Sequence, residues 1–275
     1  MRRVPISLQI ANYLNLQAQI GWMVFALGMI FFWIFALNAD LSFLTFRGSH
    51  ETTDGRVVRV ENTAATENDE RVRALHYQYS VAGRLRTGTS YTTTGETVEP
   101  GASVTVEYDE RDPSRSRIEG MRRALFGPWT LFVCFVPFTG AAILIWATLR
   151  GVKRNRLLRD GLIANGKLIA KRATLMRVNW RPVYELKFEF TARDGRRYQA
   201  TTRTAYTARF QDEAEEPLLY DPNNPAYAFV LDEMPSRPQF DRNGELRGNL
   251  AEAVVLLLVP ALAILVNGWL LWNMT

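Results

Sequence analysis

The sequence is poor in the residues that build catalytic and metal sites: among 275 residues it has one cysteine, Cys134, and two histidines, His50 and His76. A single cysteine excludes a disulfide within the chain and leaves zinc without its usual nitrogen and sulfur ligands. Cys134 lies in an apolar run, where a reactive thiolate is disfavoured. Walker A, Rossmann, H-E-x-x-H and G-x-S-x-G motifs are absent too. We therefore expect no catalytic residue, metal or cofactor, and a protein that is not an enzyme.

Charge is missing from three long windows. No Asp, Glu, Lys or Arg occurs in Ala18–Leu37, Ala124–Leu149 or Ala253–Trp272. A helix of about 20 apolar residues crosses the hydrocarbon core of a bilayer. Six of the seven tryptophans lie near the window ends, as is typical of the headgroup level. Only Gln19 and Asn267 are strongly polar inside the windows, which does not favour a transporter. The sequence predicts three transmembrane helices.

Basic residues near the window ends indicate an orientation. Ten Lys and Arg residues lie close to the spans on one side and six on the other, so the positive-inside rule places the N-terminus in the cytoplasm and the C-terminus outside. A cleaved signal peptide that ends near Ala39 is an alternative, but the apolar window and its polar lead are long for one. We expect a cytoplasmic segment at 1–17, spans at 18–37, 124–149 and 253–272, an extracytoplasmic β domain at 38–123 and a cytoplasmic β domain at 150–252.

Both water-facing segments contain strands in which apolar and polar residues alternate. The strands run into predicted turns at Gly83 and Gly195. Each segment has room for four or five short strands, which favours a small antiparallel β-barrel or sandwich over βαβ units. The residues expected to share an apolar face are Leu75, Tyr77, Tyr79 and Val81 in the first segment, and Tyr184, Leu186, Phe188 and Phe190 in the second.

The two segments repeat one pattern at an offset of 111 or 112 residues. A register that holds over nearly 60 positions indicates an internal duplication. The recurring aspartates are expected to cap turns, in preference to a catalytic or ligand role. The paired signature positions are Gly55 and Gly166, Tyr77 and Phe188, Gly83 and Gly195, Tyr108-Asp109 and Tyr220-Asp221, and Pro113 and Pro225.

The order of these motifs resembles a known family. A span is followed by G-x-V-x-x-V, Y-x-Y-x-V, a Gly turn, V-x-V-x-Y-D and a Pro, and then by another span. This order resembles a bacterial membrane family known as domain of unknown function 3592. The likeness covers residues 20–150, and 150–272 as a second, more divergent copy. It implies a small β domain held at a bacterial inner membrane, and it implies no activity.

Charged runs are interpreted mainly as solvated or interfacial segments. The acidic runs Glu67–Glu70 and Asp212–Glu216 are expected to be solvated loops. The net charge of +5 comes without aromatic interleaving or a nucleic-acid motif, so no nucleic acid partner is expected. The basic run after the middle window is either a topology signal or a contact for anionic headgroups. Its candidate lipid contacts are Arg150, Lys153, Arg154, Arg156 and Arg159.

These observations favour a non-enzymatic interaction or scaffolding module of a membrane. Its expected partners are the lipid bilayer and another membrane or envelope protein, bound through an edge strand. A membrane-bound hydrolase or processing enzyme is an alternative, with a site around Asp109, Asp221 or His76. A sensor of a small ligand or lipid is a third reading, and the oligomeric state is left open.

Overall fold

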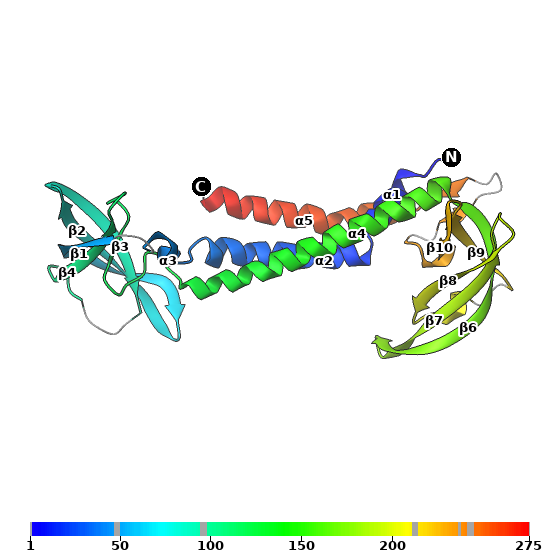
Figure 1. The fold of residues 1–275 in the computed structure, drawn as a ribbon, viewed down its shortest axis with the longest axis horizontal. Helices are drawn as coiled ribbons and strands as arrows, with labels where there is room; N and C mark the ends of the chain where they lie inside the picture. Colours follow the sequence, from blue (N-terminus) through cyan, green and yellow to red (C-terminus); the bar gives the residue numbers. More distant parts are fainter. Residues whose placement is uncertain are drawn as a thin grey trace. The chain divides into compact units, whose positions relative to one another are not determined.

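The structure is a computed structural model that describes residues 2–46, 50–93, 98–210, 214–235, 238–240 and 245–274. The chain divides into two compact units (Figure 1). The β1–β5 unit consists of Leu27–Pro137 and Leu270–Thr275. The β6–β10 unit consists of Met1–Ala26 and Phe138–Trp269.

The β1–β5 unit contains one antiparallel sheet with the strand order β3-β2-β1-β4-β5. The end strands β3 and β5 also contact each other. The side chains predicted to share a face do so, because Leu75, Tyr77 and Tyr79 are buried with Val57 and Val106. The strands are β1 (His50–Glu67), β2 (Glu70–Val81), β3 (Arg84–Thr92), β4 (Ser103–Asp109) and β5 (Ser116–Ile118).

The β6–β10 unit contains an antiparallel sheet of the same kind, with the order β10-β9-β6-β7-β8. Its end strands β8 and β10 lie against each other. The second predicted apolar face is also confirmed, since Leu186, Phe188 and Phe190 are buried and Tyr184 packs against them. The strands are β6 (Leu162–Val178), β7 (Arg181–Thr191), β8 (Arg197–Thr204), β9 (Glu216–Asp221) and β10 (Asn224–Val230).

The two sheets agree residue by residue in their pairing. Val57 pairs with Tyr77, and Leu168 pairs with Phe188, which is the same pair 111 positions later. Each long first strand has a bulge directly after that pair, and a second irregularity five residues further on. The β1–β4 and β6–β9 ladders match in the same way. The offset seen in the sequence is thus an offset in hydrogen-bonding register.

The first strands are longer than the short strands expected from the sequence. The polar stretch between the signature motifs is a continuation of β1 and β2 beyond the core, closed by a two-residue turn at Asn68 and Asp69. The β1 residues of this continuation are exposed or only partly buried, so polar residues can replace the alternating apolar pattern there. Glu67 is not a solvated loop residue: its carboxylate forms an ion pair with Arg122 at 2.7 Å and accepts a hydrogen bond from the Trp129 indole at 3.2 Å.

The acidic run of the second segment agrees with its prediction at Glu215, which is exposed outside the strands, and differs from it at Glu216. Asp212 lies outside the described residues, as do its two neighbours. Glu216 belongs to β9 and is buried, with 3% of its surface exposed. Its backbone pairs with Gly166 in β6, so this residue belongs to the sheet and not to a loop.

Three helical segments are long and apolar enough to cross a membrane: Leu16–Ala36, Pro128–Asp160 and Leu250–Asn273. The middle segment begins as a 3-10 helix and becomes α-helical at Phe135. The helices and remaining elements are α1 (Ile6–Tyr13), α2 (Leu16–Phe31), η1 (Phe32–Ala36), α3 (Ser42–Thr45), η2 (Pro128–Cys134), α4 (Phe135–Asp160), η3 (Thr207–Phe210), η4 (Leu231–Glu233), β11 (Gln239–Phe240), β12 (Leu246–Arg247) and α5 (Leu250–Met274).

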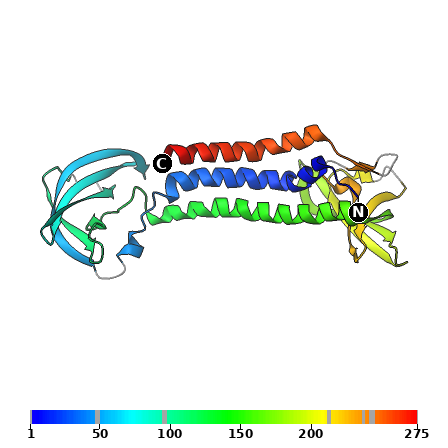
Figure 2. The same cartoon turned by 90° about the horizontal axis from the view of Figure 1, so that it is seen from above.

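Within the β6–β10 unit, α2, α4 and α5 run side by side (Figure 2). Glycine allows the close approach of α2 and α4, because a Cβ on Gly140 would lie 2.4 Å from the backbone nitrogen of Phe25. The two polar residues of the apolar windows join helices. The Gln19 amide donates to the Leu256 carbonyl at 2.9 Å, and the Asn267 amide donates to the Ala263 carbonyl in its own helix at 2.9 Å and to the Ala26 carbonyl at 3.4 Å.

Candidate functional site at the basic end of α4

The last turns of α4 are fixed against the β6–β10 unit. Leu158 is buried with Leu8 of α1 and Leu219 of β9, which explains why the helix continues past the apolar window to Asp160. The Arg2 guanidinium donates to the carbonyls of Leu158 and Gly161. A cation that binds the free carbonyls of a helix C-terminus stabilises that end. The N-terminal segment therefore holds the end of α4 in place.

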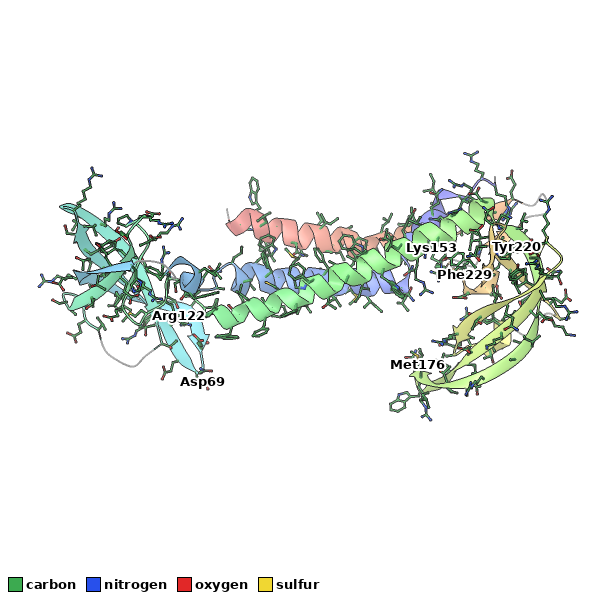
Figure 3. The ribbon with its side chains drawn as sticks, in the orientation of Figure 1. Asp69, Arg122, Lys153, Met176, Tyr220 and Phe229 are labelled. Atoms are coloured by element: carbon green, nitrogen blue, oxygen red, sulfur yellow. The ribbon has the colours of Figure 1, made fainter. Side chains whose placement is uncertain are left out.

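The basic side chains of this turn have different environments. Arg150 lies over the Trp146 ring at 4.8 Å, and Lys153 lies 5.8 Å from the centre of the Tyr227 ring. Arg154 differs, because only 5% of its surface is exposed and its guanidinium lies over Phe229 of β10. We assign Arg154 to the packing of α4 on the sheet. The lipid-contact hypothesis is therefore kept for Arg150, Lys153, Arg156 and Arg159. Figure 3 labels Lys153 in this region, together with Phe229 of β10.

A cavity of about 540 Å³ lies beside these residues, between the end of α4 and the β9–β10 turn. It combines two cations with two carboxylates and two side-chain amides, so it offers partners for both a phosphate and an ammonium group. The Asp221 carboxylate already accepts the Asn223 backbone N–H at 2.9 Å. The lining residues are Lys153, Arg156, Leu157, Asp160, Gly161, Asp221, Pro222, Asn223, Asn224 and Tyr227.

Burial shifts the pKa of two groups close to this site. It raises the pKa of the Tyr227 hydroxyl, against the charges of Arg154 and Arg150. It also raises the pKa of the Glu233 carboxyl, which faces the same two arginines. Tyr227 therefore stays protonated near neutral pH and can donate a hydrogen bond into the cavity.

The signature residues serve mainly as structural positions of the two sheets. Gly55 and Gly166 lie in β1 and β6, and Gly83 and Gly195 occupy left-handed turns with φ of 73° and 77°. The prediction that the aspartates cap turns is confirmed for Asp109, which accepts the Arg111 N–H at 2.9 Å, and for Asp221. Tyr77, Tyr108, Phe188 and Tyr220 are core residues, Pro113 accepts the Tyr79 hydroxyl, and Pro225 lies in β10.

Only one signature residue, Asp221, reaches the cavity. The sequence interpretation missed its neighbours Asn224 and Tyr227, although the Asp-Pro-Asn-Asn-Pro turn signal places polar groups there. His76 is part of a surface ladder, with Glu61 at 3.1 Å and Thr89 at 3.0 Å. No group of three or more His, Cys, Asp or Glu residues that would suit a metal ion occurs among the described residues.

Comparisons with known proteins give one family match. The family described as "Domain of unknown function (DUF3592)" matches residues 53–123, which begin within β1 and extend past β5. Curated proteins give no match. A solved structure of a replication protein A heterotrimer bound to ssDNA is similar at a TM-score of 0.18 and 9% identity. That likeness covers 78% of this chain and 53% of the other, so the chain spans about half its length, and at this TM-score it carries no argument.

Proposed function

We propose that the chain is an integral protein of a bacterial cytoplasmic membrane that acts as a non-enzymatic interaction module. Its two β units are tandem copies of one domain, each sheet closes into a small barrel, and the copies lie on opposite sides of the bilayer. The observation that carries this proposal is the repeat of hydrogen-bonding register in two sheets, one before and one after the candidate span of α4 in the sequence. Equal strand order and matching bulges are expected of duplicated domains.

The placement of the N-terminal segment supports the three-span arrangement. Arg2 and Leu8 contact the end of α4 and the β6–β10 unit. Three crossings require the N-terminus and residues 150–252 to share one side, which these contacts allow. The excess of basic residues supports the cytoplasm as that side.

The edge of β3 is the interaction surface that we propose for the β1–β5 unit. Its C-terminal end is covered, since Tyr91 forms a bridge to Arg122. Among the described residues no strand pairs with the outer edge of Arg84–Thr89. By the alternation of an antiparallel ladder, Leu85, Thr87 and Thr89 direct their backbone N–H and C=O groups to this edge. An extended segment of a membrane or envelope protein can add there as a further strand.

A second observation favours the same surface. A groove of about 490 Å³ lies on the outer face of β1, β2 and β3. Val58, the residue of the β1 bulge, lines it and is 51% exposed. An extended segment on the β3 edge would have this groove beside it for one of its side chains. The lining residues are Val58, Arg59, His76, Tyr77, Gln78, Thr87, Gly88 and Thr89.

Topology reporters test the membrane placement. Fusions after Asp40, Asp160 and Thr275 are expected to report outside, cytoplasm and outside, respectively. Equal reports from Asp40 and Asp160 would overturn the three-span arrangement.

A photo-crosslinking pair tests the β3 edge in the full chain. A benzophenone side chain at position 85 is expected to give a protein adduct in native membranes. Thr87→Pro removes an outward N–H without removing a ladder hydrogen bond, so it should abolish the adduct. Thr87→Val keeps the N–H and should preserve it. An adduct that survives Thr87→Pro contradicts the edge-strand mode.

The cavity at the end of α4 favours a second candidate function, the binding of a phosphate-containing small ligand or headgroup. Lys153 and Arg156 supply the cations for it. Lys153→Ala and Arg156→Ala are expected to weaken binding of such a ligand by the full chain, measured by calorimetry. Arg196→Ala, in the exposed β7–β8 turn and outside the cavity, is the control.

A further inference from the structure

The tip of the β6–β7 hairpin exposes four large apolar side chains. Leu175 and Trp180 are almost fully exposed, at 105% and 91%, and Met176 and Val178 are exposed by about half. Figure 3 shows Met176 at the far end of the hairpin, away from Tyr220 in the core. Four large apolar side chains exposed within six residues, 175–180, are candidates for an interaction site.

The backbone of the tip supports a functional reason for these residues. The turn is closed by Asn179 and Trp180, with φ of 49° and 64°. Asparagine tolerates the left-handed region, but a bulky aromatic residue there is an outlier. Such a residue in an exposed turn serves neither the local conformation nor the core, and conformations of this kind gather at functional positions.

The equivalent hairpin of the β1–β5 unit shows that the fold does not require an apolar tip. By the offset of 111, the positions equivalent to Leu175, Met176, Val178 and Trp180 are Ala64, Ala65, Glu67 and Asp69. That first tip is polar, and its Glu67 forms an ion pair with Arg122. The apolar tip is therefore a property of the β6–β10 unit alone.

The two hairpin tips also differ in charge. Residues 171–182 contain Lys171, Arg172, Arg177 and Arg181 and no acidic residue. The equivalent residues 60–71 contain four acidic residues and one basic residue. Tryptophan and aliphatic side chains flanked by arginine are the chemistry of a membrane interface that contains anionic lipids.

The chain is long enough to bring this tip back to the bilayer. Beyond Leu149, α4 runs eleven residues to Asp160, which is about 16 Å of helix. β6 follows one residue later and has 17 residues, about 56 Å of extended strand. The hairpin is thus several times longer than the part of α4 that follows the uncharged window ending at Leu149.

We propose that the β6–β7 tip inserts into the headgroup region of a bilayer that contains anionic lipids, beside the span formed by α4. Leu175, Met176 and Trp180 enter the interface, and Arg177 and Arg181 contact lipid phosphates. The inference rests on the membrane placement proposed above. It adds a second, peripheral contact that fixes how the β6–β10 unit faces the membrane surface.

Depth-dependent quenching of the full chain in vesicles tests this contact. In a Cys134→Ser background, Met176→Cys, Leu262→Cys in α5 and Arg196→Cys in the β7–β8 turn each carry one NBD label. The vesicles contain phosphatidylethanolamine and phosphatidylglycerol with a spin-labelled lipid as quencher. Quenching is expected at positions 176 and 262, with little at 196. Arg177→Gln with Arg181→Gln, or vesicles of phosphatidylcholine alone, should lower quenching at 176 at least twofold.

The three labels distinguish the possible failures. Quenching at 262 with none at 176 overturns the hairpin contact and leaves the membrane placement intact. No quenching at 262 overturns the membrane placement, and the hairpin contact with it. A label at 176 that is unquenched in vesicles but protected from aqueous iodide in native membranes would assign the tip to a protein partner and overturn the lipid contact.

Discussion

Gly166 in β6 lies directly against Leu218 in β9: a Cβ added to this glycine would stand 2.6 Å from the Leu218 Cδ2 atom. Gly55 in β1 has the same relationship to Val106 in β4, again at 2.6 Å. In each sheet the fourth strand is the hydrogen-bonded neighbour of the long first strand, and the glycine leaves room for a core side chain of that neighbour. The glycine signature thus has a packing reason in each sheet.

Replacing Gly166 with valine should destabilise the β6–β10 unit. The added side chain collides with Leu218 and with the Phe188 Cβ atom, which lies 3.2 Å from the added Cβ. Overpacking of a filled core costs about 1–3 kcal/mol. Thermal unfolding of the detergent-solubilised chain should show the lower stability. Asn165→Val, on the exposed neighbour, is the control, and an equal loss in both variants would contradict the packing role.

Arg122→Gln should loosen the β1–β2 hairpin tip. The Glu67–Arg122 ion pair is largely shielded, with side-chain exposures of 16% and 21%, so removal of one partner leaves the other charge poorly solvated. We expect a local loss of about 1–3 kcal/mol, seen as faster amide exchange at residues 67–70. Arg59→Gln breaks the exposed Arg59–Glu61 pair and should change exchange little. Unchanged exchange in Arg122→Gln would contradict the role of the pair.

Features that depend on local periodicity were predictable from the sequence. Alternation placed Tyr77 and Phe188 in the cores, and the absence of charge identified the candidate spans. The constant offset located the shared register because backbone pairing preserves residue spacing. These patterns need no knowledge of distant contacts.

Features that depend on contacts between distant residues were not predictable. Glu67 meets Arg122 across 55 positions only because a long hairpin extends past the core. Burial of Arg154 on Phe229 depends on where β10 packs, so it was grouped with the exposed basic residues. The cavity beside α4 combines Lys153 with Tyr227, which lie on different elements, so no single stretch of sequence shows it.

The titration of Glu233 should make stability depend on pH. Burial raises its pKa above the ordinary value, against the charges of Arg154 and Arg150. A group whose pKa is higher in the folded state contributes stability below its unfolded pKa, about 4.3 for Glu, and loses it as the pH rises through the folded pKa. Glu233→Gln should remove this decline, which begins near the unfolded pKa as the pH rises, in thermal unfolding.

A matched surface variant gives the comparison for that titration. Glu185 pairs with Arg203 at 2.9 Å on the exposed face of β7. Glu185→Gln should keep the decline in stability that the unsubstituted chain shows. If the stability of the Glu233→Gln variant falls with rising pH in parallel with that of the unsubstituted chain, another group causes the decline.

The Gln19 amide should hold α2 to α5. The amide donates a hydrogen bond to the Leu256 carbonyl, and lipid tails offer it no such partner. Interhelical hydrogen bonds of this kind contribute about 0.6–2 kcal/mol. Gln19→Leu should lower the unfolding temperature in detergent. It should also lower the yield of crosslinks between a cysteine placed on α2 and a cysteine placed on α5. Asn38→Leu is the control, because the Asn38 amide donates to the Ile34 carbonyl close by in sequence. Equal behaviour of the two variants would show that the Gln19 bond does not join the helices.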